Sequence, residues 1–401
     1  MLNSIQIFGV VLLGGLVSGE LSRRAFALPR TSGYILFGLL VGQSGFGLIT
    51  PYHIQSAQLF IDLALGLILF ELGYLVPSAS VSEGWQRLWA GLSIALTTGV
   101  LITLALLAWG FSAISAIFSA ALCLATSPAI TIATCSDVGA KGDKTGLLFT
   151  MVALNVCVAF IAVALLNPFL AEYETASGFS VAWEAMQKIC GSVILGVACA
   201  GLTLLSAEWL GRRPEQQHLL FLGTIVLGVG TAIYFDISAL LPMLLFGFIT
   251  RALDRDKQVV PIRIASDARI FLVVTFVLAG AASDLGLLVQ YWPEAVCVAV
   301  ARFVGQTIAV FGNKNRLGLS SKSSLYLSIG LQPMSSVALV LLANTQTLNS
   351  GLDPKLTGTL LATILLMQLL GPLATLVSIK GFGETNRLRP KYSAEEGPAA
   401  T

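Results

Sequence analysis

Polar residues inside long apolar runs are the features of this sequence that could do chemistry. Thr126-Ser127-Pro128 interrupts the apolar run 113–135, and a lone amide, Asn155, stands in the run 146–170. Proline removes a backbone donor and disfavours helix just before it, and an unpaired amide in an apolar segment is costly. Interrupted membrane helices expose carbonyls and hydroxyls that can hold an ion or solute. We therefore take Thr126, Ser127 and Asn155 as candidate ion or substrate ligands.

A second interrupted run lies near the C-terminal end. Pro333 breaks the run 322–343, and Ser335 and Ser336 follow it. Two proline-interrupted spans in corresponding positions are the strongest sequence indication of a transporter's midplane site. Polar residues flank both Pro128 and Pro333, which favours this interpretation over the ordinary abundance of proline in membrane helices. Ser335 and Ser336 join the candidate ligands.

Arg302 lies inside the apolar run 291–311. A guanidinium there is expensive unless it is paired or faces a cavity. The sequence leaves three kinds of partner open for this guanidinium: acids such as Asp62 or Glu71, carbonyls at the helix breaks, or a bound anion. Asp62 and Glu71, both in the run 57–76, are also the candidate proton carriers.

The composition limits the class of protein. Of 401 residues, 56% are hydrophobic and 11% charged, against about 25% charged in soluble domains, so the chain is an integral membrane protein in contact with lipid. The net charge of +2 does not suggest nucleic acid. Six cysteines without a CxxC pair and two histidines support neither a metal site nor a cofactor. No hydrolytic constellation is present, so we do not expect an enzyme.

Hydropathy divides the chain into membrane spans. About 17–25 apolar residues are needed for each span, and the sequence predicts thirteen within one membrane domain, residues 1–380, followed by a disordered cytoplasmic tail, 381–401. The predicted spans are 4–21, 32–50, 57–76, 88–110, 113–135, 146–170, 183–206, 217–234, 236–253, 268–287, 291–311, 322–343 and 356–378.

Loop charges orient these spans. With the N-terminus outside and the C-terminus in the cytoplasm, all but three of the 23 lysines and arginines fall in cytoplasmic segments, the exceptions being Lys188, Lys355 and Arg302. This asymmetry follows the positive-inside rule. Twelve of the spans form two sets of six, at about 1–170 and 217–378, and a linker helix at 183–206 joins the two sets. Each interrupted span is the fifth of its set, so we read the two sets as repeats. The odd number of spans between the sets makes the repeats inverted.

Several segments in order resemble the monovalent cation/proton antiporter superfamily, nearest its second branch of bacterial sodium or potassium/proton exchangers. The resemblance covers nearly the whole chain. It lies in the glycine-rich segment 33–42, in Leu-Phe-Glu-Leu-Gly at 69–73, in Ala-Thr-Ser-Pro at 125–128, in Leu-Leu-Phe-Gly-Phe at 244–248, in 271–285, in Arg302 and in 331–341.

The resemblance implies a fold with two inverted six-helix repeats, a core domain in which two broken helices cross, and a dimerisation domain. It also implies elevator-like alternating access, a homodimer and the bacterial inner membrane. In the family an aspartate follows the asparagine of the sixth helix and carries the ion and proton, but here the pair is Asn155-Val156. The usual Thr-Asp-Pro is likewise Thr126-Ser127-Pro128. Neither Val156 nor Ser127 can exchange a proton for a cation near neutral pH.

Three functions remain open at this point. The first is a secondary transporter that moves a monovalent cation, Na⁺ or K⁺, with or without exchange for protons, through an atypical site. The second is transport of an anion or small acid recognised by Arg302, because helix N-termini at the crossing favour negative charge. The third is a membrane sensor or subunit that does not transport and binds a protein partner.

Overall fold

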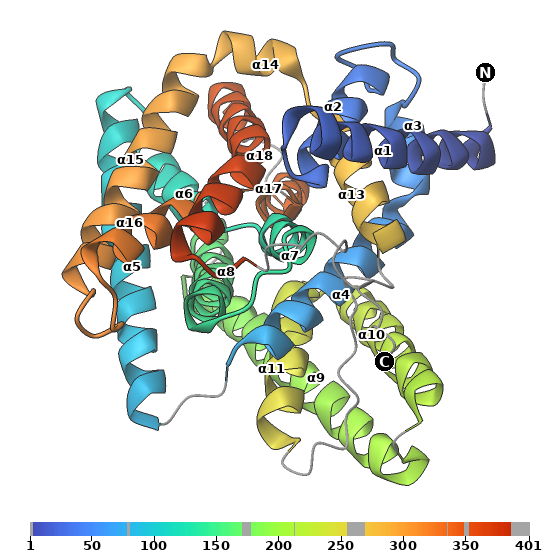
Figure 1. Ribbon diagram of the computed structural model, residues 1–401. Helices are drawn as coiled ribbons and strands as arrows, with labels where there is room; N and C mark the ends of the chain where they lie inside the picture. Colours follow the sequence, from blue (N-terminus) through green and yellow to red (C-terminus); the bar gives the residue numbers. More distant parts are fainter. Residues whose placement is uncertain are drawn as a thin grey trace, which may run out of the picture.

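The computed structural model describes residues 3–77, 81–170, 178–211, 213–254, 269–334, 336–348 and 353–385, and every regular element in these ranges is an α-helix (Figure 1). Nine helices of the described part are long and apolar enough to cross a membrane, and three shorter apolar helices accompany them. Many outward side chains are apolar; Leu13, Leu96 and Ile194 are each more than half exposed. The protein is therefore an all-helical, multi-pass membrane protein, as its composition predicts.

The helices follow one another without strands in the described residues. In chain order they are α1 (Ser4–Phe26), α2 (Arg30–Val41), α3 (Pro51–Ser56), α4 (Gln58–Leu75), α5 (Val81–Ala108), α6 (Ala113–Cys123), α7 (Pro128–Asp137), α8 (Asp143–Leu170), α9 (Gly178–Leu210), α10 (Pro214–Tyr234), α11 (Leu240–Leu253), α13 (Arg269–Ala281), α14 (Leu285–Gln290), α15 (Trp292–Gly312), α16 (Ser321–Gly330), α17 (Ser336–Leu348) and α18 (Pro354–Phe382).

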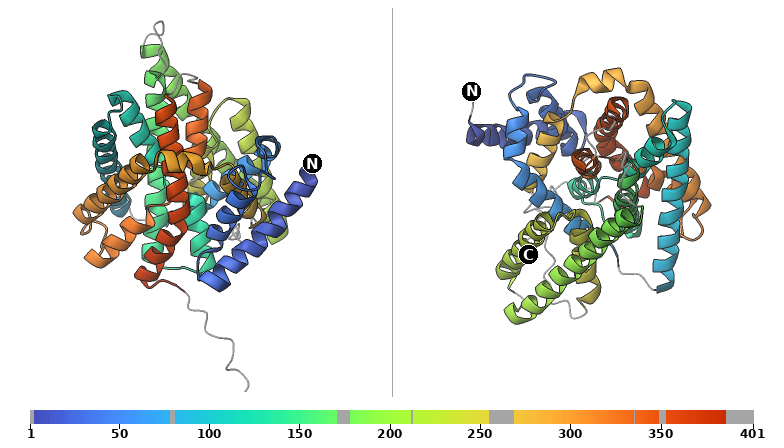
Figure 2. Two further views of the ribbon diagram at one scale, coloured as in Figure 1. Left: turned by 90° about the horizontal axis from the view of Figure 1, so that it is seen from above. Right: turned by 180° about the vertical axis from the view of Figure 1, so that it is seen from behind.

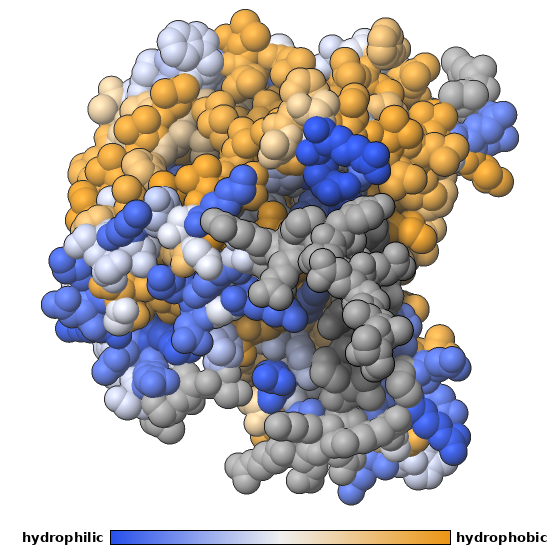
Figure 3. Space-filling model, in the orientation of Figure 1, coloured by the Kyte–Doolittle hydropathy of each residue, from blue (hydrophilic) through white to orange (hydrophobic). Residues whose placement is uncertain are grey.

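All the described helices except the short α3 and α14 fall into two groups (Figures 1 and 2). We call the first the crossing bundle; it contains α5, α6, α7, α8, α15, α16, α17 and α18. The second, the flanking bundle, contains α1, α2, α4, α9, α10, α11 and α13. On the face seen in Figure 3, hydrophobic residues cover most of the upper part, and hydrophilic residues gather mainly below them.

Reciprocal glycines hold the flanking bundle together. A Cβ added at Gly38 of α2 would lie 2.1 Å from the carbonyl oxygen of Val277, and one at Gly280 of α13 would lie 2.3 Å from that of Ile35. Only glycine allows backbones to approach so closely, which is how membrane helices without a hydrophobic driving force gain packing energy. Gly73 of α4 and Gly247 of α11 repeat the arrangement.

Each predicted span contains a helix, but two of the predicted spans extend beyond the end of their helix. The span predicted at 32–50 is α2, which ends at Val41 and is followed by a turn in which Gly47 has φ +64°. The span predicted at 268–287 ends at Ala281, and Asp284 then caps the separate helix α14. Both turns continue into further apolar residues, Phe46, Leu48 and Ile49 in the first and Leu285 in the second, so hydropathy alone does not reveal the end of the helix.

The end of α18 lies against the start of α8. Glu384 accepts hydrogen bonds from the backbone N–H of Lys144 (3.0 Å) and of Thr145 (2.7 Å). A carboxylate at a helix N-terminus satisfies free backbone donors and complements the helix dipole. The first residues of the predicted tail thus take part in the fold, whereas residues 386–401 lie outside the described part.

Candidate ion site

The first helix break is built by a local cap. α6 ends at Cys123, and α7 begins at Pro128, whose missing N–H is no loss at a first helical position. The Ser127 hydroxyl accepts a hydrogen bond from the N–H of Ile130 (3.3 Å), as an N-cap residue does. Thr126, Ser127 and Pro128 are all buried. The sequence Thr-Ser-Pro therefore interrupts the helix inside the protein.

The second break meets the first. α16 ends at Gly330 and α17 begins at Ser336. The N–H of Ser127 donates to the carbonyl oxygen of Pro333 (2.8 Å), and the Thr126 hydroxyl donates to that of Leu331 (3.2 Å). Segments about 200 residues apart in the chain therefore satisfy each other's free backbone groups, as a membrane interior requires. The two interrupted helices contact each other at their breaks.

Arg302 of α15 joins the two breaks. Its Nε donates to the carbonyl oxygen of Cys123 (2.8 Å), its Nη1 to that of Gln332, and its Nη2 to the Thr126 hydroxyl (3.1 Å) and the Ala125 carbonyl (3.4 Å). The side chain is fully buried. Cys123 ends α6 and Gln332 follows α16, so the guanidinium lies at two helix C-termini, where partial negative charge favours a cation.

The Thr126 hydroxyl is the central atom of this network. It donates to Leu331 and accepts from Arg302 and from the Asn155 side-chain amide (3.1 Å). One donor and two acceptor sites are all that a hydroxyl has. Thr126 therefore positions its neighbours and has no lone pair left for an ion, whereas the Asn155 carbonyl oxygen keeps its acceptor capacity.

Two glutamines extend the network, and Gln306 was not among the residues expected from the sequence. Gln306 donates to the carbonyl oxygen of Leu331 (3.4 Å) and accepts from Gln332, which also donates to the carbonyl oxygen of Ser328 (2.9 Å). Gln306 follows Arg302 by one helical turn, so both project from the same face of α15. Two polar residues four positions apart within one apolar span are the sequence signal that could have indicated Gln306.

The remaining predicted site residues lie in different places. Val156, on α8 beside Asn155, is buried. Ser335 lies outside the described residues, and Ser336 is described only as the first residue of α17. Asp62 and Glu71 are half-buried on α4 in the flanking bundle.

The two candidate acids do not pair with Arg302. Asp62 accepts from Gln58 on its own helix (2.9 Å). In the described part of the chain every hydrogen bond of Arg302 goes to a carbonyl or a hydroxyl, and none goes to Asp62 or Glu71. Of the three partners that the sequence left open for this guanidinium, the structure shows the carbonyls at the helix breaks.

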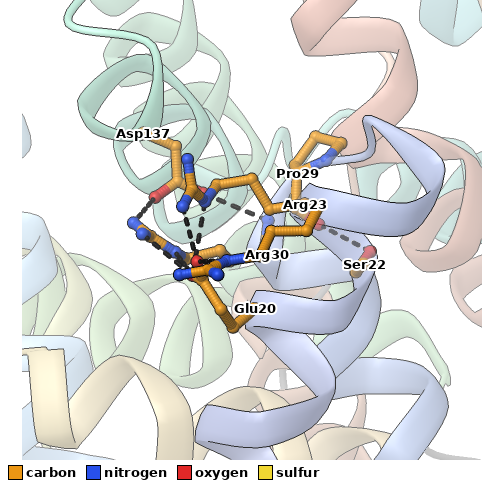
Figure 4. A network of polar contacts seen from close by, with 7 residues as sticks. Glu20, Ser22, Arg23, Pro29, Arg30 and Asp137 are labelled. Carbon is orange, nitrogen blue, oxygen red and sulfur yellow. Dashed lines mark hydrogen bonds and ion pairs between the residues drawn. The ribbon is translucent and has the colours of Figure 1, made fainter.

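Carboxylates gather elsewhere, in a group of residues that we call the edge cluster (Figure 4). Glu20 of α1 pairs with Arg23 and Arg24 on its own helix and with Arg30 of α2 (3.2 Å). Arg30 also pairs with Asp137 at the end of α7 (3.0 Å), and its N–H donates to the same carboxylate (3.1 Å). The edge cluster thus connects the flanking bundle to the half-helix that begins at the ion site.

The family follows from comparison with known proteins. A family model described as "Sodium/hydrogen exchanger, transmembrane" matches residues 8–377. The chain belongs to the sodium/hydrogen exchanger family. It is therefore a membrane transporter and not an enzyme. No curated protein matches this sodium/hydrogen exchanger chain.

Solved structures agree on the fold of this exchanger. The sodium proton antiporter MjNhaP1 from Methanocaldococcus jannaschii at pH 8 matches with a TM-score of 0.69 and 18% identity, over 95% of this chain and 99% of that one. An electron-microscopy structure of MjNhaP1 matches with a TM-score of 0.69 and 17% identity, over 94% of each chain. The exchanger therefore has an MjNhaP1-like fold, which at this identity says nothing of its ion site.

Proposed function

We propose that this exchanger-family protein moves a monovalent cation, Na⁺ or K⁺, through a site of uncharged ligands at the contact between the two helix breaks. The observation that carries the proposal is the set of partners around Arg302. Carbonyls and the Thr126 hydroxyl accept the hydrogen bonds of the guanidinium. Arg302 therefore needs no carboxylate at position 127 or 156 as a partner. The cation ligands are then the Ser127 and Asn155 oxygens and carbonyl oxygens of the breaks.

The absence of these acids has a mechanistic consequence. A carboxylate exchanges a proton for a cation because both compete for one oxygen pair. Hydroxyl, amide and carbonyl oxygens bind a cation and do not titrate near neutral pH. Cation binding at this site is therefore independent of pH, and any proton coupling runs through acids elsewhere, with Asp62 and Glu71 as the candidates on α4.

Arg302 supports the cation proposal over the anion alternative. An anion-recognition arginine needs donors that point into the binding site. Here Nε, Nη1 and Nη2 all donate to the breaks, and the side chain has no exposed surface. Binding an anion would require Arg302 to leave both breaks.

The finer architecture is part of the same proposal. We propose thirteen spans in two inverted repeats, with the N-terminus outside and the C-terminus in the cytoplasm of the bacterial inner membrane, and a homodimer. The helix breaks at corresponding positions and the charge asymmetry of the loops support the repeats and the orientation. An elevator-like movement of the crossing bundle against the flanking bundle would change the side to which the site opens.

Reconstituted protein tests this function. Proteoliposomes loaded with Na⁺ or K⁺ should take up radioactive tracer cation faster than protein-free vesicles. Asn155→Leu, which removes a proposed ligand and keeps the side-chain size, should abolish most of that uptake, whereas Thr363→Val on α18 should not. Uptake of chloride or a small carboxylate in place of the cation would contradict the proposal, and so would the absence of any flux in protein shown to be folded.

A further inference from the structure

A glutamine in the last helix is buried without a polar partner among the described residues. Gln368, in the middle of α18, has no exposed surface, and neither its Nε2 nor its Oε1 has a hydrogen-bond partner in the part of the chain that the structure describes. Buried polar groups of native proteins are nearly always satisfied, and an unsatisfied amide is costly. A costly polar group that persists in a core points to a ligand that the protein binds there.

The position of Gln368 relates it to the ion site. Gln368, Gly371, Thr375 and Ser378 are spaced three, four and three residues apart and share one face of α18. A Cβ at Gly371 would lie 2.9 Å from Cβ of Pro333, so this face packs directly on the second break.

The same face also reaches the first break and the end of α16. The added Cβ at Gly371 would lie 3.4 Å from the side chain of Ile130, whose N–H is capped by Ser127. One at Gly330, the last residue of α16, would lie 2.5 Å from the Ser378 hydroxyl. Gln368 precedes Gly371 by one turn, about 4.5 Å along the helix axis. Gln368 therefore lies one turn from the residue of α18 that packs against both breaks.

An oxygen on α18 would add to the ligands of the proposed ion site. Thr126 has no acceptor capacity left, because Arg302 and Asn155 occupy it. Hard cations exchange water for amide and carbonyl oxygens, and a glutamine amide offers one such oxygen together with two donors.

We propose that Gln368 is an unassigned ligand of the transported cation. Its Oε1 contacts the partly hydrated ion, and its Nε2 donates to a water of the ion's shell. The inference rests on the proposed cation transport, and it assigns α18 as one wall of the site. The ion would thus be held by groups from α7, α8 and α18, with Arg302 of α15 setting the geometry of the breaks.

If Gln368 binds the cation, its buried amide should lower the stability of the fold and raise the affinity for the ion. Replacing an unsatisfied buried amide with an apolar group of similar size removes its desolvation cost. Gln368→Leu should therefore unfold at a higher temperature than the wild type in detergent. The same variant should need about tenfold more cation for half-maximal tracer uptake, as expected for the loss of one ligand of about 1.4 kcal/mol.

Three further variants make the test specific. Thr363→Val is the matched control, because Thr363 is buried on α18 and, in the described ranges, its hydroxyl bonds only the carbonyl oxygen of Thr359 on the same helix. Uptake by this variant should keep its wild-type cation dependence. Gln368→Glu places an acid at the proposed ligand position, so its half-saturating cation concentration should fall as pH rises. Gln368→Met replaces the leucine variant if that one does not fold.

The outcomes separate this inference from the proposed function. Wild-type uptake with an unchanged cation requirement in Gln368→Leu, or in Gln368→Met, would overturn the role of Gln368 alone. A lower unfolding temperature with the same cation requirement would assign the residue to packing and would overturn it too. Absence of cation uptake by folded wild-type protein would overturn the proposed function and this inference together.

Discussion

Arg302 at the contact between the helix breaks and Arg30 in the edge cluster have contrasting environments. Arg302 is fully buried and, among the described residues, bonds only carbonyls and a hydroxyl, whereas Arg30, whose side chain is a quarter exposed, bonds the carboxylates of Glu20 and Asp137. Near water, a guanidinium ordinarily forms an ion pair with a carboxylate. In the interior, this chain stabilises the charge with the dipoles of two helix C-termini.

The difference bears on transport. The edge cluster contains carboxylates that pair with arginines, whereas Arg302 has no carboxylate among its described partners. Under the proposed function, the contact between the breaks therefore lacks a carboxylate that could carry a proton. It holds a fixed positive charge, which carbonyls of the breaks stabilise through hydrogen bonds, and a set of neutral oxygens.

The largest effect is expected for Arg302. Arg302→Met keeps much of the side-chain volume but leaves the Cys123, Ala125 and Gln332 carbonyls without their donor. Its free energy of unfolding should fall by about 3–5 kcal/mol, as when one partner of a buried charge interaction is removed. Thermal unfolding in detergent measures the loss. Arg302→Lys should recover only part of it, because an ammonium cannot reproduce the fork that reaches both breaks. Wild-type stability in Arg302→Met would contradict the role of Arg302 as the link between the breaks.

A smaller effect is expected at the edge cluster. Asp137→Asn should cost about 1 kcal/mol, because the pair with Arg30 is partly exposed to solvent. A double-mutant cycle with Arg30→Gln should give a coupling of about 0.5–1 kcal/mol that decreases as salt is added. The loss in Arg302→Met should not depend on salt. Equal salt dependence at the two positions would remove the distinction between them.

The smallest effect is expected from restoring one acid. Val156→Asp places a carboxylate beside Asn155, but Ser127 stays neutral, so we expect no cation-dependent proton release from proteoliposomes that carry a pH-sensitive dye. Val156→Asp combined with Ser127→Asp should produce it. The single variant is the control for the pair, and robust exchange by Val156→Asp alone would show that one acid is sufficient.

Local signals in the sequence were enough to place a helix in each predicted span and to locate both breaks, but not to find the ends of α2 and α13. Thr126-Ser127-Pro128 and Pro333 fall where the helices end, because a missing N–H acts on the nearest turn. Interactions between distant segments could not be read in this way. The pair of Arg30 with Asp137 spans 107 residues, and the saturation of the Thr126 hydroxyl depends on three elements meeting at one atom. Gln368 is similar, since its lack of a partner is a property of the packed core.

The pH dependence of cation binding to the wild-type protein tests the central claim most directly. Bound Na⁺ or K⁺ raises the unfolding temperature by mass action, so titrations of that stabilisation from about pH 6 to about pH 9 yield an affinity at each pH without transport. A site of neutral oxygens around Ser127, Asn155 and Gln368 predicts one affinity across the range. An affinity that rises about tenfold per pH unit over part of it would show that a carboxylate binds the ion, and would contradict the account.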